Sequence, residues 1–350
     1  MRAVLSILLL AFWATRAFAV GEWQIIKRDG RDYVTLENVG KFYQLGEVQQ
    51  VRGSGFVLRT QYRSLRGQSG SKELYINNLK FILSYPIVET HGQLLVSRMD
   101  LTKLIEPVLR PGRITNASKV TTVVLDPGHG GHDHGARCVF GAEKNFTLDV
   151  ALRTRALLRA AGFQVVMTRS SDVFIPLEER ARIANRYQNA IFISIHFNSS
   201  SNNAGGLETY ALAPRGVPSM AADGPKLSDF TPCPGNVRDT ENIALACATH
   251  ASMVYSSKMF DRGIKRARFV VIRDVTIPGV LVEGGFLSNS EDARRIASTG
   301  HRQQMAASLT QAVKNYRNAV GGVRPPLPVV SVDSNSKPAE PVVITGSSTQ

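Results

Sequence analysis

The feature that most constrains the fold is an alternation of apolar runs and helical periodicity that begins at Val120. Residues 121–125 are an apolar run typical of a buried strand. In residues 148–161 apolar side chains recur at helical spacing, and Gly162 is suited to end a helix there. Strands that alternate with helices predict an α/β domain, with a mixed, mostly parallel sheet covered by helices on both faces. We expect this domain to span residues 120–318.

The same alternation continues beyond the first strand and helix. We expect further strands at residues 163–168, 190–195, 206–211, 269–272 and 279–282, and further helices at residues 176–187, 240–256 and 301–316. The prolines of residues 213–238 exclude a long helix there, and a loop of that length in a compact domain is usually functional. Residues 321–350 are rich in Pro, Ser and Val without periodicity, which predicts a disordered tail.

Residues 1–19, MRAVLSILLLAFWATRAFA, have the features of a secretory signal peptide. Arg2 supplies the positive start, an apolar core follows, and Ala17 and Ala19 form a cleavage site of small residues. A membrane anchor is the competing interpretation, but the apolar run is shorter than the roughly 20 residues that span a bilayer. We expect a mature chain that begins at Val20, has no stable membrane span and lies in the periplasm or outside the cell.

Residues 20–113 predict a small α+β accessory domain that precedes the α/β domain. Residues 23–43 suggest a strand, a turn at Asp29-Gly30, a second strand and a short helix. Further strands are expected at residues 54–62, 73–76, 80–83 and 94–97, and a closing helix at residues 99–109. The segment carries no cluster of His, Cys or carboxylate side chains, so a structural or wall-facing role is the favoured interpretation.

The formal net charge of the 350-residue chain is +14, which favours an anionic partner. Lys and Arg are spread along the chain, no nucleic-acid motif accompanies them, and no aromatic residues are interleaved with a basic patch. We therefore expect a cell-wall or envelope partner and no nucleic acid.

The chain has three cysteines, Cys138, Cys233 and Cys247, and their spacing does not indicate a thiolate zinc site. An odd number leaves at least one thiol without a partner in the same chain. Two interpretations stay open: a bridge between Cys233 and Cys247, or three free thiols.

Four polar side chains of ligand type lie at the ends of apolar runs in the α/β domain. His129 follows the first strand, Glu143 opens the first helix, and His196 and Glu283 each end a buried strand. The carboxyl ends of parallel strands lie at one edge of a sheet, where open α/β folds bind ligands. These side chains could converge there.

Two histidines and one carboxylate are a usual catalytic zinc set, and a further carboxylate is then needed to accept the proton of the attacking water. Each residue also has an ordinary interpretation. His129 alone could be a solvated loop residue, and Glu143 could only favour the helix dipole. His196 and Glu283 follow core strands, where an unpaired polar group is costly, so a partner or a task is expected for each.

The motifs DPGHGG, Glu-Lys at the next helix, SIHFN and VLVEGGFLSN, in this order, resemble the zinc-dependent N-acetylmuramoyl-L-alanine amidases of bacterial cell walls (amidase type 3). A run from Arg169 through Asp172 to Arg180 also matches that family. The resemblance covers roughly residues 120–316 and implies that His129, Glu143 and His196 bind Zn²⁺ and that Glu283 is the catalytic general base. The implied reaction is hydrolysis of the amide between N-acetylmuramic acid and L-alanine in peptidoglycan, for cell-wall remodelling, daughter-cell separation or turnover.

Some features depart from this family's pattern. Residues 213–238 lie where some division amidases carry an autoinhibitory helix, and their prolines keep that regulation from being carried over. His132 and His134 are additions to the first motif, with exposed loop imidazoles as the favoured interpretation. Residues 30–34, GRDYV, more faintly resemble the small N-terminal domain of copper amine oxidases, without the histidines that copper would need.

Two alternatives to an active amidase remain. One is an inactive amidase-like peptidoglycan-binding protein, against which the four intact site residues count. The other is an exported zinc peptidase, against which the absence of HExxH spacing counts. Peptidoglycan is the expected partner, and a protein activator is a further candidate.

Overall fold

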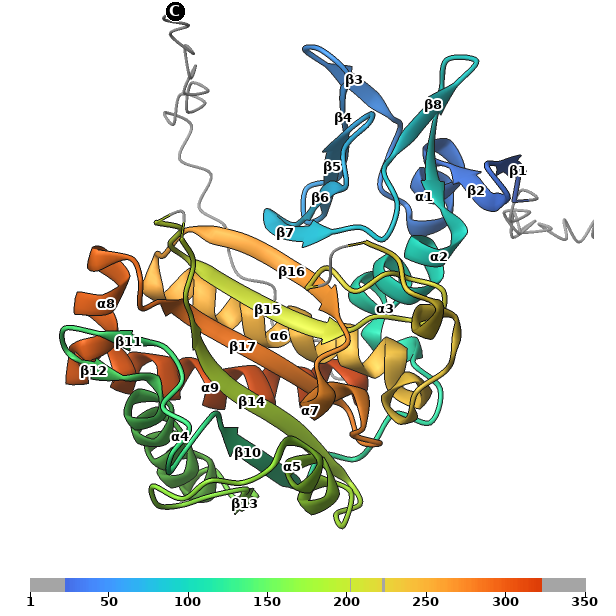
Figure 1. Cartoon of the computed structure of the whole chain (residues 1–350). Coiled ribbons are helices and arrows are strands. Elements are labelled where there is room, and N and C mark those ends of the chain that lie inside the picture. Colours follow the sequence, from blue (N-terminus) through green and yellow to red (C-terminus); the bar gives the residue numbers. More distant parts are fainter. Residues whose placement is uncertain (1–22, 202, 222–223, 323–350) are drawn as a thin grey trace, which may run out of the picture.

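The computed structural model describes residues 23–201, 203–221 and 224–322 (Figure 1). The predicted signal peptide lies outside these residues, as does all but the first two residues of the predicted tail. Among the helices of the described part, none is long and apolar enough to cross a membrane.

The N-terminal unit opens with a strand, a tight turn, a second strand and a helix, as predicted. Asp29 and Gly30 both have positive φ, 49° and 71°, which is the turn geometry that joins antiparallel strands. The hydroxyl of Thr35 accepts a hydrogen bond from the Asn38 amide at 3.1 Å and so caps the first helix. The elements are β1 (Ile25–Arg28), β2 (Arg31–Thr35), α1 (Leu36–Tyr43), β3 (Gln49–Val51), β4 (Gly55–Arg59), β5 (Ser64–Gln68), β6 (Glu73–Ile76), β7 (Leu79–Ile82), β8 (Val88–Thr90), β9 (Gln93–Ser97), α2 (Arg98–Asp100), η1 (Leu101–Ile105), α3 (Glu106–Leu109) and η2 (Pro111–Arg113).

The remainder of the described chain alternates strands and helices. Its elements are β10 (Thr122–Pro127), β11 (Arg137–Cys138), β12 (Gly141–Ala142), α4 (Glu143–Ala160), β13 (Gln164–Met167), α5 (Leu177–Ala184), β14 (Ala190–Asn198), β15 (Leu207–Leu212), η3 (Leu227–Phe230), η4 (Pro234–Arg238), α6 (Asp239–Ser257), β16 (Asp261–Ala267), α7 (Val270–Arg273), β17 (Gly279–Phe286), α8 (Ser290–Ala297) and α9 (Thr299–Val320). In residues 213–238 the described part contains only the short 3₁₀ helices η3 and η4, in agreement with the prolines there.

Within the α/β part of the chain, the main sheet confirms the predicted mixed, mostly parallel arrangement. Its order is β13-β10-β14-β17-β15-β16, continued by β7-β6-β5-β4-β3 of the N-terminal unit. Strands β13, β10, β14 and β17 are mutually parallel, β15 is antiparallel to β17, and β16 is parallel to β15. The carboxyl ends of β10, β14 and β17 therefore share one edge of the sheet.

The two faces of this sheet are covered unequally (Figure 1). Three long helices, α4, α6 and α9, pack on one face with the side chains of the larger core. Among the described helices, α5 and α7 alone lie on the other face, where they enclose a smaller core that includes Phe192 and Leu281. Because these helices are short, they cover part of that face, and side chains further along β14 and β17 are left for a site.

One predicted strand is wrong. Residues 269–272 were expected to be extended, but Val270–Arg273 is the helix α7, in which the Arg273 amide bonds the Phe269 carbonyl at 2.8 Å. Val271 and Ile272 are buried against the smaller core. Val271 and Ile272 are therefore apolar because they cover the sheet, and not because they form one of its strands.

All three cysteines lie in the described part of the chain, and each has a free thiol. The suggested bridge between Cys233 and Cys247 is therefore not formed. Cys247 lies in α6, where burial raises the pKa of its thiol to about 12.

Candidate active site

His129 lies two residues beyond β10, where the backbone turns sharply. Its own φ is 60°, in the left-handed region. Two arginines fix this turn: Arg180 donates to the carbonyl of His129 at 2.7 Å, and Arg169 donates to the carbonyl of Gly128 at 2.8 Å. The main chain that carries the imidazole is thus held in one conformation.

Arg180 is held in turn by Asp126 of β10. Their ion pair measures 2.8 Å, and the two side chains are 2% and 0% exposed. The hydroxyls of Thr168 and Ser194 donate to the same carboxylate at 2.6 and 2.7 Å. Because a buried pair of charges is stable only when its remaining polar atoms are bonded, this network forms a rigid base beneath the His129 loop.

Glu143 is the first residue of α4, where the helix dipole favours a negative charge. Its carboxylate is 3% exposed and accepts hydrogen bonds from the amides of Ala136 and Phe197 at 2.9 and 3.0 Å. Burial opposes its ionisation, but hydrogen bonds and charge from His129 and His196 hold the pKa of Glu143 well below its usual range. Glu143 is therefore an anion fixed in place.

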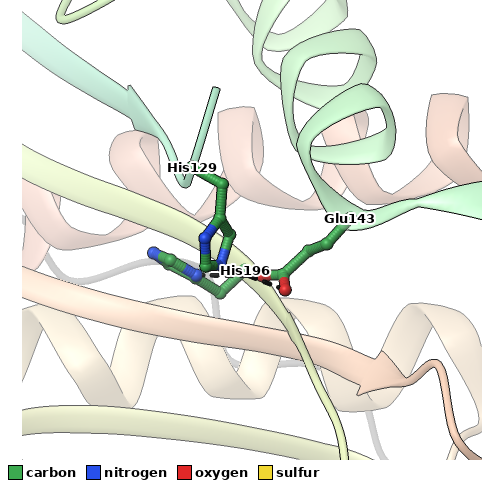
Figure 2. A group of neighbouring side chains, drawn as sticks. All are labelled: His129, Glu143 and His196. Carbon is green, nitrogen blue, oxygen red and sulfur yellow. Dashed lines mark hydrogen bonds and ion pairs between the residues drawn. The ribbon is translucent and has the colours of Figure 1, made fainter. Parts of the chain in front are cut away.

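His129, Glu143 and His196 come together from a loop, a helix start and a strand (Figure 2). Nε2 of His129 lies 3.1 Å from Oε2 of Glu143, and Nδ1 of His196 lies 2.9 Å from Oε1 of the same carboxylate. One ligand atom from each residue lies within 4.8 Å of the others. Asp133 bonds Nδ1 of His129 at 2.8 Å and leaves Nε2 to face the group.

Two glycines leave the space that this group needs. A Cβ added at Gly128 would lie 2.2 Å from the His196 ring, and one added at Gly135 would lie 2.5 Å from Oε2 of Glu143 and 2.6 Å from the His129 ring. The loop backbone therefore approaches the three side chains more closely than any other residue type permits. Two imidazole nitrogens and one carboxylate oxygen, packed in this way, are a donor set that could hold a metal ion.

Glu283 lies beside this group on β17. It is paired with His196 of β14 in parallel register and with Glu208 of β15 in antiparallel register. Its Oε2 is buried and makes no hydrogen bond to any described residue. Burial and the charges of Glu143 and Glu208 raise the pKa of Glu283 well above its ordinary value, against the opposing charge of Lys265. A carboxylate in this setting can accept a proton.

The two other histidines of the first motif, His132 and His134, lie outside this group, and so does the buried carboxylate of Glu241. His132 is exposed and stacks on Phe174, with ring centroids 4.2 Å apart, and neither His132 nor His134 belongs to the metal-type group. Glu241 lies in α6 and bonds Arg238 and the amide of Ser118, away from the group.

Sequence reasoning missed two supporting residues. Asp133 orients His129, and its spacing of four residues in a glycine-rich loop gives no recognisable pattern. Glu208 lies opposite Glu283 because β15 runs antiparallel to β17. That reversal of strand direction left no signal in the sequence.

Comparison with known proteins finds amidases among the matching family models, relatives and solved structures. The family model for N-acetylmuramoyl-L-alanine amidase matches residues 123–315. The amidase AmiA of Escherichia coli K12 is 34% identical over an alignment of 217 residues, and the match covers 55% of this chain and 75% of AmiA. AmiC of Neisseria meningitidis is 33% identical over an alignment of 245 residues, and the match covers 63% of this chain and 57% of AmiC. Among solved structures, the amidase AmiC2 of Nostoc punctiforme is 33% identical with a TM-score of 0.47, and the match covers 57% of this chain and 98% of that chain.

Proposed function

The chain belongs to the N-acetylmuramoyl-L-alanine amidase family, and on that premise we propose that it binds Zn²⁺ through His129, Glu143 and His196 and uses Glu283 as its general base. Its reaction is hydrolysis of the amide that joins N-acetylmuramic acid to L-alanine in peptidoglycan. The observation that carries the proposal is the convergence of these three ligand-type side chains on one point. Beside them, in register with His196, lies Glu283, whose buried Oε2 makes no hydrogen bond to a described residue.

The donor set suits zinc. Neutral imidazole nitrogen and carboxylate oxygen are the ligands of catalytic zinc sites with three protein donors, and thiolates are not required. When bound, zinc would polarise the scissile carbonyl and lower the pKa of a bound water to about 7. Neighbouring residues shape the site. Gly128 and Gly135 let the loop backbone approach the three ligand side chains closely, and Asp133 fixes the orientation of the His129 ring.

Glu283 would move the proton. Its carboxylate accepts a proton from the attacking water as the new carbon–oxygen bond forms at the lactyl carbonyl. It then delivers that proton to the nitrogen of L-alanine as the carbon–nitrogen bond breaks, so that the stem peptide leaves as a neutral amine and the sugar keeps a carboxylic acid. The raised pKa of Glu283 suits both steps, since a group that is too acidic would hold a proton poorly.

We further propose the organisation and location that the sequence predicts. Residues 1–19 would direct export and be removed, residues 20–113 would form the wall-facing accessory unit, and residues 120–318 would form the catalytic domain. The net charge of +14 supports an anionic wall polymer as the partner, and the periplasm or the outside of the cell as the location.

Digestion of purified sacculi tests the proposal. The mature protein, expressed from Val20 and loaded with zinc, should hold about one zinc ion per chain. Mass spectrometry should find released stem peptides that begin with L-alanine, together with glycan strands whose lactyl groups are free. New ends within the stem peptide would identify a peptidase, and binding to sacculi without release would identify an inactive wall-binding protein.

A further inference from the structure

A row of polar side chains continues the proposed zinc group across the sheet. Directly paired residues of neighbouring strands project from the same face, so His196, Glu283 and Glu208 form a line over β14, β17 and β15. Lys265 of β16 is paired with Tyr210, which lies on the same face as Glu208 because it is two residues further along β15. The line therefore extends to β16.

Glu208 cannot serve as a second base in this row, because its oxygens are fully engaged. Its side chain is 2% exposed, and Oε1 accepts from Nε of Arg262 at 2.7 Å and from Nζ of Lys265 at 2.5 Å. Oε2 accepts from the hydroxyl of Tyr210 at 2.7 Å and from Nδ2 of Asn198 at 3.3 Å. Two cations thus share a single oxygen of one carboxylate.

Arg262 is held in place by its neighbours, but some of its hydrogen-bond donors are still available to a ligand. Its Nε donates to Glu208, and its guanidinium carbon lies 5.1 Å from the centroid of the Phe286 ring, a cation–π contact that helps to hold it in place. Its side chain is 30% exposed, and neither Nη1 nor Nη2 makes a hydrogen bond to a described residue. A guanidinium held through Nε, with both terminal NH2 groups free, is suited to bind a carboxylate.

From this geometry we propose that Arg262 and Lys265, supported by Glu208, form a subsite that binds a carboxylate of the stem peptide and so positions the scissile amide. This proposal rests on the proposed function, because it takes the zinc group and Glu283 as the place of cleavage. Bound substrate would thus contact the sheet at two points: the amide at β14 and β17, and an acidic side group at β16.

The distance between the proposed zinc group and the subsite agrees with the length of a short stretch of stem peptide. Strands β14 and β16 lie three strand intervals apart, roughly 14 Å at about 4.8 Å each. Arg262 reaches back toward Glu208 across one of these intervals, as its 2.7 Å contact requires. About two intervals therefore remain between the Arg262 guanidinium and β14. Two to three residues of an extended peptide cover that distance at about 3.3 Å each. The second and third residues of the stem peptide are therefore the candidates for the carboxylate.

Matched substrates test the proposal and distinguish a carboxylate on the second residue of the stem peptide from one on the third. One pair is N-acetylmuramoyl-L-Ala-γ-D-Glu-L-Lys and its analogue with the α-carboxylate of Glu converted to a carboxamide. A third substrate replaces L-Lys by meso-diaminopimelate, which adds a carboxylate at the third residue. Because the cleavage of short substrates can be slow, the same comparison is made on uncrosslinked glycan strands that carry each stem peptide.

We expect the wild-type enzyme to favour the form with the recognised carboxylate by about tenfold or more in kcat/KM, mainly through KM, because hydrogen bonds between charged groups are the strong ones. Arg262→Gln should bring the ratio between matched substrates close to one, and Arg262→Lys should restore part of it. Arg110→Gln is the control. Like Arg262, Arg110 pairs with a glutamate, Glu106, and lies over an aromatic ring, that of Phe42, but it belongs to the N-terminal unit. Arg110→Gln should leave the ratio unchanged.

If Arg262→Gln lowered kcat/KM equally on substrates with and without the recognised carboxylate, the role of Arg262 would be purely structural and the proposal would be overturned. A wild-type enzyme that cleaves all forms equally well would also overturn it. Failure of the wild-type enzyme to release any stem peptide from sacculi would instead contradict the proposed function itself. The two failures are therefore distinguishable.

Discussion

His196 in β14 and Glu283 in β17 are directly paired in parallel register, which places a proposed zinc ligand and the proposed base side by side on one face of the sheet. Neighbouring strands lie about 4.8 Å apart, and the hydrogen-bonded ladder fixes that spacing. The two groups that the proposal assigns to one water molecule are therefore positioned by backbone structure, and loop residues complete the candidate site around them.

The close approach of Gly128 to His196 gives a first prediction. In Gly128→Ala the added Cβ would meet the His196 ring at 2.2 Å, so either the ring or the loop must move. A displacement of about 1 Å at a catalytic centre can cost about 10²-fold in rate. We expect activity on sacculi to fall by at least that factor and zinc to bind more weakly, as measured by competition with a chelator.

Gly300→Ala is the matched control for this substitution. Its Cβ would meet only Oγ of Ser298 at 3.7 Å, an ordinary contact at the start of α9. Activity and zinc affinity should remain at the wild-type level. Unchanged zinc affinity in Gly128→Ala would contradict the packing described around His196.

Removal of the partner of His129 gives a second prediction. Asp133→Ala deletes the 2.8 Å bond to Nδ1 of His129, which selects the ring orientation that presents Nε2. Loss of such a partner typically weakens metal binding by about 10–100-fold. Zinc titration should show this loss in Asp133→Ala and none in His132→Ala, since the His132 ring stacks on Phe174 instead. Similar losses in both variants would reassign the role of the loop histidines.

The buried pair of Arg180 and Asp126 gives a third prediction. Arg180→Met leaves the Asp126 charge buried without its partner, which typically costs about 3–5 kcal/mol of unfolding free energy. Arg182→Met in the same helix removes an exposed pair with Glu179, and surface substitutions usually stay within about 0.5 kcal/mol. Urea denaturation of the two variants checks this contrast. Equal stability in both would mean that the pair beneath the His129 loop is dispensable.

Asp261 gives a prediction about pH. It accepts bonds from His250 and from the amides of Gly263 and Lys80, the last of which joins β16 to β7. Burial opposes its ionisation, but the bond and charge of His250 and these amides lower the pKa of Asp261. A lowered folded-state pKa gives stability that is full above the unfolded-state value of about 4 and is lost as the pH falls through the folded-state value.

Asp261→Asn should therefore cost about 1–3 kcal/mol of unfolding free energy at pH 7, since it weakens hydrogen bonds to a charged group. The difference from the wild-type protein should shrink as the pH is lowered to 3, as urea denaturation at each pH will measure. A difference that stays constant over this range would show that the carboxylate charge does not contribute.

Much of the fold could be predicted because the pattern is local. Buried strands such as β10 and β14 are unbroken apolar runs, and the polar residues that follow them mark the edge where the site forms. Elements with mixed composition were missed. β16 reads DRGIKRA, whose charged side chains hide a strand, and α8 begins at Ser290 with a cap from Asn289 that was not recognised.

The candidate site was predictable residue by residue only where a strand end or a family motif marked the residue. His129, Glu143, His196 and Glu283 were named in this way. Arg262 and Lys265 were not, because their place beside Glu208 depends on strand order and on a register shift between β15 and β16. Contacts set by sheet topology between distant segments have no signature in the local sequence.

The most direct test of the central claim is the zinc content and turnover of Glu283→Gln. The substitution keeps the size of the side chain and removes only the proton acceptor, beside ligands that are left intact. We predict about one zinc ion per chain, as in the wild-type protein, and a fall in kcat of about 10²–10⁴-fold on sacculi. Full activity in Glu283→Gln, or loss of its zinc, would contradict the assignment of Glu283 as the base beside the zinc group.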